Sequence, residues 1–152
     1  MNTLRILVLT SVLFGSLLSC KKDDGNDPNP TVTSQTELLV ANNWQVTSIT
    51  TPDGQLINYS RLNLVSQVLP QLKFQFRADN SVRAFDPKQS NSTVNAGSWY
   101  LATDNKSMDV DVTGFKGNFP IIQLSRNKLI LRQIAPVDGK NADINLVFDP
   151  AL

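Results

Sequence analysis

The chain has 152 residues, of which 14 are Lys or Arg, 13 are Asp or Glu, one is Cys and none is His. Its 41% hydrophobic and 18% charged residues are typical of one globular domain, and a net charge of +1 offers no basic surface for nucleic acid. Because His is absent and a lone Cys forms no internal disulfide, we expect a protein that is not an enzyme and that needs no cofactor or metal.

The first 19 residues are predicted to be an export signal. Arg5 provides a short positive start, and residues 6–18 are largely apolar. A helix that crosses a bilayer must cover about 30 Å of hydrocarbon at about 1.5 Å per residue, which this apolar run is too short to do. The run therefore fits the hydrophobic part of a cleaved signal peptide.

A cysteine follows this signal directly. The run Leu17-Leu18-Ser19-Cys20 resembles the lipobox of bacterial lipoproteins, which implies that Cys20 becomes the first mature residue and carries the lipid. The attached acyl chains would hold the protein on a membrane. We therefore expect a lipoprotein whose membrane partner is reached through Cys20.

The residues after Cys20 are polar. Lys21, Lys22, Asp23 and Asp24 resemble the export tag of Bacteroidota surface lipoproteins, with a plain solvated tether as the alternative. The tag implies an outer-membrane protein exposed at the cell surface. Residues 20–36 are then the lipidated Cys and a flexible tether, and residues 37–152 are the folded domain.

A short helix is predicted where the folded domain begins. Ser34-Gln35-Thr36-Glu37 matches a capping box, in which the Ser and Glu side chains accept hydrogen bonds from free backbone N–H groups. Leu38, Leu39 and Val40 follow and indicate one or two helical turns.

From Trp44 onward, apolar and polar residues alternate with the period of a half-buried strand. Turn residues separate these runs, and the prolines are assigned to strand ends and connections. The pattern favours an all-β, eight-stranded antiparallel up-and-down barrel, with a two-sheet sandwich as the alternative. The eight strands are expected around residues 44–49, 72–77, 82–84, 97–102, 108–112, 119–124, 128–134 and 143–149.

One stretch between the first two strands departs from the alternation. Apolar residues recur there at helical spacing, and Pro70 is expected to end the run. The segment would either cover the mouth of a barrel as a lid or plug it as structure. Its apolar residues are Tyr59, Leu62, Val65, Val68 and Leu69.

Four sequence segments resemble the small lipocalin-like domains of Bacteroidota lipoproteins: residues 38–47, 74–82, 96–101 and 122–131. The resemblance covers most of residues 37–135. It implies a lipocalin-like barrel with a binding pocket, and a late Arg that stacks on the first-strand Trp44. Arg132 is the expected residue, with Arg126 as the alternative.

The resemblance and the inward strand faces together suggest a ligand site. The candidates are the large inward side chains and the lid residues: Trp44, Tyr59, Leu62, Phe74, Phe76, Trp99 and Phe148. Small barrels either fill their interior or hold one ligand, so the five inward aromatic residues are also consistent with a filled core. We expect a small apolar or amphipathic ligand. The alternative is a non-enzymatic docking subunit of an outer-membrane complex with a filled barrel.

Two acidic residues share one face of a predicted strand. Asp109 and Asp111 are one strand period apart, which is compatible with a metal pair or with a solvated outer face. We expect the solvated face, with Lys73, Arg77 and Arg83 as the basic residues within cross-strand reach.

Overall fold

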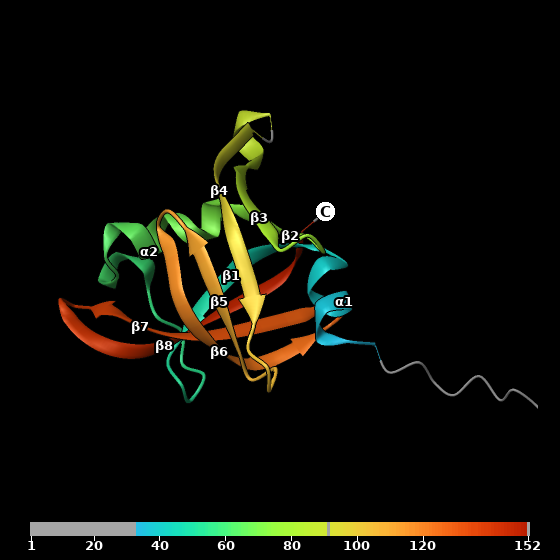
Figure 1. Cartoon of the computed structure of the whole chain (residues 1–152). Coiled ribbons are helices and arrows are strands. Elements are labelled where there is room, and N and C mark those ends of the chain that lie inside the picture. The colour runs from blue at the N-terminus through green and yellow to red at the C-terminus, as the bar shows by residue number, and fades with distance from the viewer. Residues whose placement is uncertain (1–32, 91, 152) are drawn as a thin grey trace, which may run out of the picture. The chain divides into compact units, whose positions relative to one another are not determined.

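Eight antiparallel strands form a closed barrel in which each strand pairs with the next and the last returns to the first (Figure 1). This confirms the predicted up-and-down topology and excludes the two-sheet sandwich. Closure satisfies the backbone groups that a sheet edge would expose. The strands are β1 (Asn43–Thr50), β2 (Lys73–Phe76), β3 (Ser81–Asp86), β4 (Ser92–Leu101), β5 (Ser107–Val112), β6 (Phe115–Ser125), β7 (Lys128–Val137) and β8 (Lys140–Ala151).

The computed structural model describes residues 33–90 and 92–151. Every described helix and strand belongs to one compact unit, residues 32–152. The expected signal peptide, Cys20 and the export tag lie outside the described residues. Within the described ranges, no helix has the length and apolar character needed to cross a membrane.

The predicted first helix is present as α1 (Gln35–Val40), and its capping box is confirmed. The Ser34 backbone N–H donates to the Glu37 carboxylate at 2.7 Å, and the Glu37 N–H donates to the Ser34 hydroxyl at 3.2 Å. Leu39 is fully buried, and its carbonyl accepts a 2.8 Å hydrogen bond from the Trp44 indole. The fold therefore begins inside residues 20–36, which were expected to be tether.

Up-and-down connectivity places successive connections at opposite ends of the barrel. The end near α1, here called the closed end, carries the β2–β3, β4–β5 and β6–β7 turns. The opposite end, here called the open end, carries the long β1–β2 connection and the β5–β6 and β7–β8 turns. Figure 1 shows α1 and α2 (Leu64–Val68) at these two different ends.

The segment with helical spacing, residues 58–69, is not one continuous helix. It forms η1 (Tyr59–Arg61), α2 and η2 (Leu69–Gln71), with Leu62 and Asn63 extended between the first two. Leu62 pairs with Val137 in an isolated β-bridge, and this pairing interrupts the helix. Pro70 does not end the run as expected but lies in the first turn of η2, where a missing N–H costs little. We call residues 57–72 the lid segment.

Several strands run longer than the alternation indicates. β4 begins at Ser92, and β8 begins at Lys140 after the two-residue turn Asp138-Gly139, whose φ angles are 51° and 76°. Pro120 lies inside β6 rather than at its end. It is the last β6 residue paired with β5, immediately before the irregular pairing with β7 begins at Ile121.

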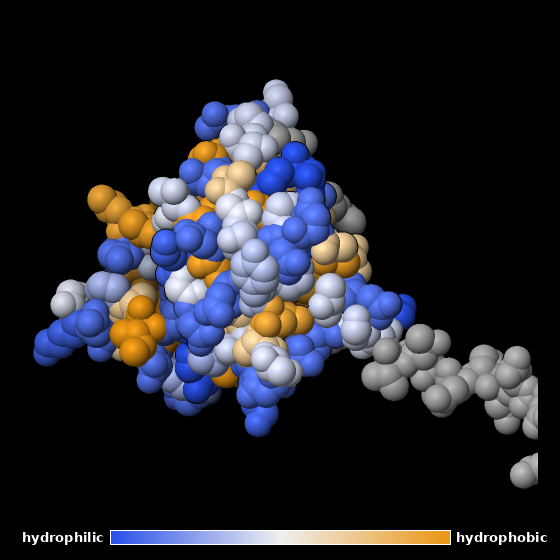
Figure 2. Space-filling view, in the orientation of Figure 1, coloured by the Kyte–Doolittle hydropathy of each residue, from blue (hydrophilic) through white to orange (hydrophobic). Residues whose placement is uncertain are grey.

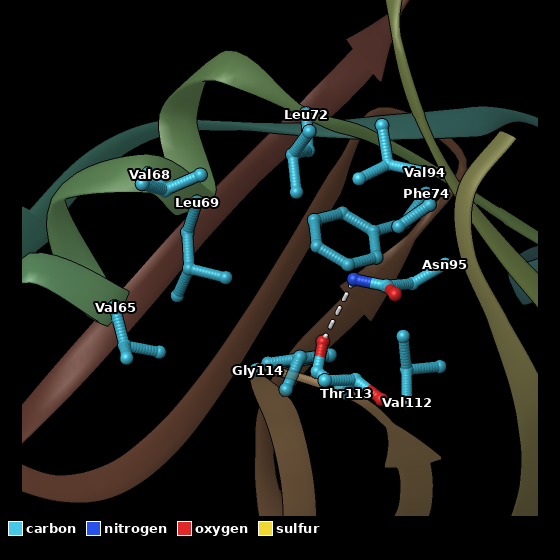
Figure 3. Close-up of a pocket in the computed structure, with 12 residues that line it drawn as sticks. Val65, Val68, Leu69, Leu72, Phe74, Val94, Asn95, Val112, Thr113 and Gly114 are labelled. Carbon is cyan, nitrogen blue, oxygen red and sulfur yellow. Dashed lines mark hydrogen bonds between the residues drawn. The ribbon is translucent and has the colours of Figure 1, made fainter. Parts of the chain in front are cut away.

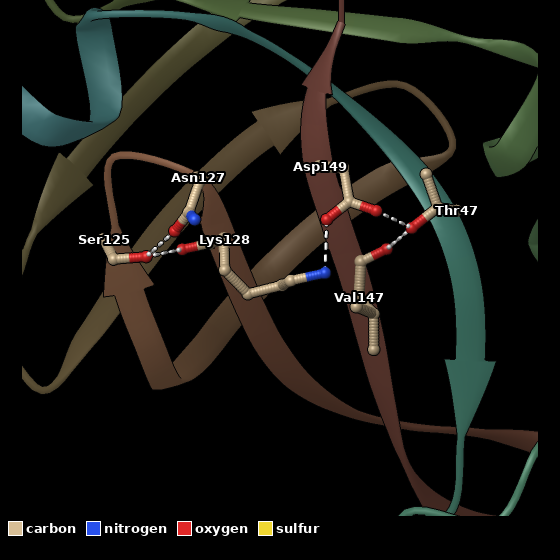
Figure 4. A network of polar contacts seen from close by, with 6 residues as sticks. All are labelled: Thr47, Ser125, Asn127, Lys128, Val147 and Asp149. Atoms are coloured by element: carbon tan, nitrogen blue, oxygen red, sulfur yellow. Dashed lines mark hydrogen bonds and ion pairs between the residues drawn. The ribbon is translucent and has the colours of Figure 1, made fainter.

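The barrel closes between β1 and β8 under a polar network on its surface (Figure 4). The Asp149 carboxylate accepts hydrogen bonds from the Lys128 ammonium and, at 2.7 Å, from the Thr47 hydroxyl. One carboxylate thus joins β7, β8 and β1. The Lys128 hydrogen bond, helped by Thr47, lowers the pKa of Asp149. The contact therefore stabilises the fold at neutral pH and is lost as pH falls through that lowered pKa.

Candidate functional site

A pocket of about 230 Å³ opens at the open end of the barrel, between α2 and the ends of the strands (Figure 3). We call it the α2 pocket. Helical residues of the lid segment form one wall, and β2 to β6 provide the others. The pocket is lined by Val65, Val68, Leu69, Leu72, Phe74, Ala84, Val94, Asn95, Val112, Thr113, Gly114 and Phe115.

Apolar side chains dominate this lining, and none of the lining residues is charged. The polar side chains are those of Asn95 and Thr113. Asn95 donates through Nδ2 to the Thr113 carbonyl at 3.1 Å, which ties β4 to the β5–β6 turn. A pocket of this chemistry retains an apolar group by excluding it from water and offers no charge to hold an ionic one.

Aromatic rings form the floor of the α2 pocket. The Phe74 and Phe115 ring centroids are 5.1 Å apart, and Phe148 lies below them at 6.0 Å and 6.3 Å. Phe119 extends the cluster, 4.5 Å from Phe115. All four side chains are buried, so aromatic rings fill the interior directly beneath the pocket.

The inward orientation of the five predicted aromatic residues is confirmed, because each is at most 1% exposed. Contact with the α2 pocket, however, is made by Phe74 alone. Trp44 and Trp99 are tied to the closed end, since their indole N–H groups donate to the carbonyls of Leu39 and Arg77 at 2.8 Å and 3.0 Å.

The remaining candidates have structural contacts. Phe76 packs edge-on against Trp99 with ring centroids 5.8 Å apart, while Phe148 belongs to the floor. Leu62 is buried in its bridge to Val137. Tyr59 donates from its hydroxyl to the Thr47 carbonyl at 3.2 Å, and its partial burial raises the pKa of the phenol.

Sequence reasoning missed most of the pocket. Val65, Val68 and Leu69 carried a signal, because they belong to the predicted helical stretch. Val94, Asn95 and the residues 112–115 carried none, since they line the pocket only because β4, β5 and β6 end at the same place. Their role depends on strand neighbours that the local pattern does not specify.

The lid segment is held to the barrel on both sides of α2. Arg61 donates to the Asp138 carboxylate through Nε at 2.9 Å and through an Nη at 2.7 Å. The Asp138 N–H in turn donates to the Arg61 carbonyl at 2.8 Å. Beyond α2, the Gln45 amide donates to the Pro70 carbonyl at 2.9 Å. The lid segment therefore has fixed ends at β1 and at the β7–β8 turn.

A second hollow, of about 300 Å³, lies on another side of α2. It shares Val65, Leu69, Gly114 and Phe115 with the α2 pocket, so the two are neighbours across the same helix. Its remaining lining comes from Asn63, Ser66, Lys116 and the β7 residues 133–136. We call it the β7 groove.

The prediction that Arg132 stacks on Trp44 is wrong, because the two side chains lie on opposite faces of the sheet. Arg132 alternates with the buried Leu131 along β7, so it lies on the outer face of the sheet. Its Nε donates to the Asn145 side chain at 3.1 Å. Arg126 is exposed in the β6–β7 turn, where its carbonyl accepts a 2.8 Å hydrogen bond from Asn42.

Asp109 and Asp111 lie on the outer face of β5, as expected, but their partners differ from those predicted. Lys116 donates to Asp111 at 3.0 Å, and Asn118 donates to Asp109 at 2.9 Å. Both partners are on β6, which pairs directly with β5. Lys73, Arg77 and Arg83 belong to β2, its following turn and β3, which are not neighbours of β5.

Within the described ranges, no group of three or more Cys, Asp or Glu side chains is close enough together to hold a metal ion. Arg77 and Arg83 both donate to the Gln75 amide oxygen, at 3.1 Å and 2.7 Å, on the outside of the barrel.

A closed up-and-down barrel of eight strands, with a helix at one end and an apolar pocket at the other, is a lipocalin-like fold. A fold of this kind is suited to binding a small ligand in the mouth of the barrel.

Two solved structures from Bacteroides are similar to this chain. One is a lipocalin-like protein from Bacteroides uniformis, with 14% identity, a TM-score of 0.49, and coverage of 74% of this chain and 98% of the other. The other is a duf4847 family protein from Bacteroides vulgatus, with 16% identity, a TM-score of 0.50, and coverage of 76% and 96%. No family model matches the sequence, and no curated protein does. The likeness to the Bacteroides vulgatus structure concerns the fold and agrees with the barrel predicted from the sequence.

Proposed function

We propose that this protein binds the apolar end of a small amphipathic molecule in the α2 pocket, without catalysing a reaction on it. The observation that carries the proposal is the pocket itself, which is apolar, uncharged and open to solvent. Its volume of about 230 Å³ is below the roughly 300–1,000 Å³ of common ligand sites. The pocket therefore suits one hydrocarbon chain end, with the polar part of the ligand left outside.

Chain length provides the test. Each buried methylene contributes about 0.8 kcal/mol, so affinity should rise about fourfold per methylene and then level off once the pocket is full. The folded unit, residues 32–152, would be titrated with straight-chain alcohols that displace a fluorescent apolar probe. An extrinsic probe is needed because neither Trp44 nor Trp99 lines the pocket.

A matched pair of variants assigns the binding to this pocket. Val68 lines it and is 46% exposed, whereas Ile122 is also 46% exposed but does not line it. Val68→Asp should lower the affinity for the longest alcohol that binds at least tenfold, because a carboxylate would replace part of the apolar wall. Ile122→Asp should leave its affinity unchanged. Equal affinities in the two variants, or an affinity independent of chain length, would contradict the proposal.

We further propose that the protein is anchored through Cys20 and displayed at the surface of the outer membrane. The lipobox resemblance of residues 17–20 and the polar residues Lys21, Lys22, Asp23 and Asp24 support this assignment. A barrel held near a membrane would meet apolar molecules where they are most concentrated. The alternative of a docking subunit accounts for the filled interior but leaves the α2 pocket without a role.

Replacement of the anchoring residue should release the protein from the membrane. In Cys20→Ser the acyl chains have no attachment site, so we expect an exported chain that either moves from the membrane fraction to the soluble fraction or keeps its signal peptide uncleaved. Fractionation of cells that express both forms would measure this. A Ser19→Ala variant, which keeps a small residue before Cys20, should remain with the membrane. Membrane attachment of a Cys20→Ser chain that has lost its signal peptide, equal to that of the unchanged chain, would refute the anchor.

A further inference from the structure

Exposed aliphatic side chains gather around the opening of the α2 pocket. Leu64 is 79% exposed, Val65 is 52% exposed and Val68 is 46% exposed, all on α2. Val94 on β4 is 48% exposed and lines the α2 pocket. Ile134 on β7 is 70% exposed and lines the β7 groove. Figure 2 shows hydrophobic side chains projecting at the left of the view, where Figure 1 places α2. We call these five residues the apolar rim.

The segments that carry the apolar rim contain no charged residue of their own. The segments that carry it and the lining of its pocket, residues 62–72, 92–95, 112–115 and 133–136, have no Asp, Glu, Lys or Arg. Two cations close to these segments, Arg61 before α2 and Lys116 in the lining of the β7 groove, are each paired with a carboxylate. Arg61 meets Asp138 at 2.7 Å, and Lys116 meets Asp111 at 3.0 Å. An ionic partner surface would find no charged side chain on the rim itself, whereas the hydrocarbon boundary of a bilayer requires none.

The chain outside the structure is long enough to bring the rim to a membrane. Between Cys20 and residue 33 the chain spans at most roughly 45 Å, at about 3.3–3.6 Å per residue. A strand of ten residues such as β7 extends roughly 33 Å at about 3.3 Å per residue. The tether can therefore pass the length of the barrel, although α1 and the rim are at different ends.

We propose that the apolar rim rests on the surface of the membrane that holds the Cys20 lipid. The α2 pocket then opens at the bilayer boundary, and its ligand enters from the lipid without crossing water. Because the rim is uncharged, contact depends on its aliphatic side chains and not on anionic lipids. This inference rests on the proposed function, since it needs both the anchor and the pocket.

Flotation with phosphatidylcholine vesicles tests the rim by itself. The unit 32–152 would be mixed with vesicles over a range of lipid concentrations, and the bound fraction measured. Leu64→Asp and Ile134→Asp should each lower the partition coefficient at least tenfold, because a charge at the interface opposes insertion. Ile122→Asp is the control. Ile122 is an exposed aliphatic residue on β6, close to the β6–β7 turn of the closed end, and it lines neither the α2 pocket nor the β7 groove.

Three further results decide the inference. Replacement of a third of the lipid by phosphatidylglycerol, or addition of salt, should leave the partition coefficient unchanged. Vesicle binding that requires anionic lipid would overturn the proposal. Equal flotation of Leu64→Asp and Ile122→Asp overturns it as well. So does light scattering that finds a dimer which Leu64→Asp converts to monomer, because the rim would then bind a second copy of the chain.

The same variants separate this inference from the proposed function. Leu64 does not line the α2 pocket, so the Leu64→Asp variant should keep its affinity for the alcohols in solution. The same variant should no longer bind vesicles. If the protein floats with vesicles, Leu64→Asp abolishes that flotation and no alcohol binds, then the membrane-binding rim is supported and the ligand-binding proposal is refuted. If the protein binds alcohols but does not float with vesicles, the ligand-binding proposal is supported and the membrane-binding rim is refuted.

Discussion

Gly97→Ala is expected to abolish stable folding of the barrel. A Cβ atom at position 97 would lie 1.7 Å from the carbonyl oxygen of Asp111 and 2.8 Å from its carbonyl carbon. Both are backbone atoms of the paired strand β5, so no change of rotamer relieves the clash. Overpacking costs about 1–3 kcal/mol where side chains can move, and we expect more than about 3 kcal/mol here because a strand must move.

Urea denaturation followed by circular dichroism would measure this loss. Ala96→Ser is a suitable control, because Ala96 precedes Gly97 on β4 and its side chain is exposed. Its free energy of unfolding should stay within about 0.5 kcal/mol of the unchanged chain. A folded Gly97→Ala protein of unchanged stability would show that β4 and β5 are not as closely packed at this point as the structure has them.

Phe74→Ala should both destabilise the protein and enlarge its ligand site. The ring contacts Phe115 at a centroid distance of 5.1 Å and Phe148 at 6.0 Å, and it is fully buried. Removal of a buried Phe ring costs about 3–5 kcal/mol. Because Phe74 is also part of the lining of the α2 pocket, the lost volume would join the pocket. The alcohol chain length at which the affinity levels off should therefore increase.

Phe148→Ala separates the two effects. Phe148 is fully buried in the same cluster but is not part of the pocket lining, so its loss should cost a similar free energy of unfolding. The preferred chain length should remain that of the unchanged protein. Calorimetry gives the stability, and probe displacement gives the length dependence. An identical shift of chain length in both variants would show that the pocket and the core are one cavity.

Features that depend on residues close in sequence could be predicted. The capping box of residues 34–37 needs only neighbours three positions apart, and α1 formed as expected. The inward placement of Trp44, Phe74 and Phe148 follows from the two-residue period of a strand, which is a property of the backbone itself. Eight such runs with short connections were sufficient to indicate an up-and-down barrel.

Helical spacing alone misjudged the lid segment. Its apolar residues recur every three or four positions, but the chain is extended at Leu62 and Asn63 because Leu62 pairs with Val137. That partner is 75 residues away along the chain. A local pattern cannot include a contact of this range, and the contact outweighs the weak helical preference of a five-residue turn.

The sequence by itself determined the strand faces, the capped first helix and the aromatic interior, because each follows from a local period or a short motif. Only the tertiary structure decided which side chains meet: Asp111 with Lys116, Arg61 with Asp138, and Arg132 with Asn145. The α2 pocket belongs to this second group. Its walls come from α2 and the ends of five strands, and they converge only because closure between β1 and β8 brings those ends together.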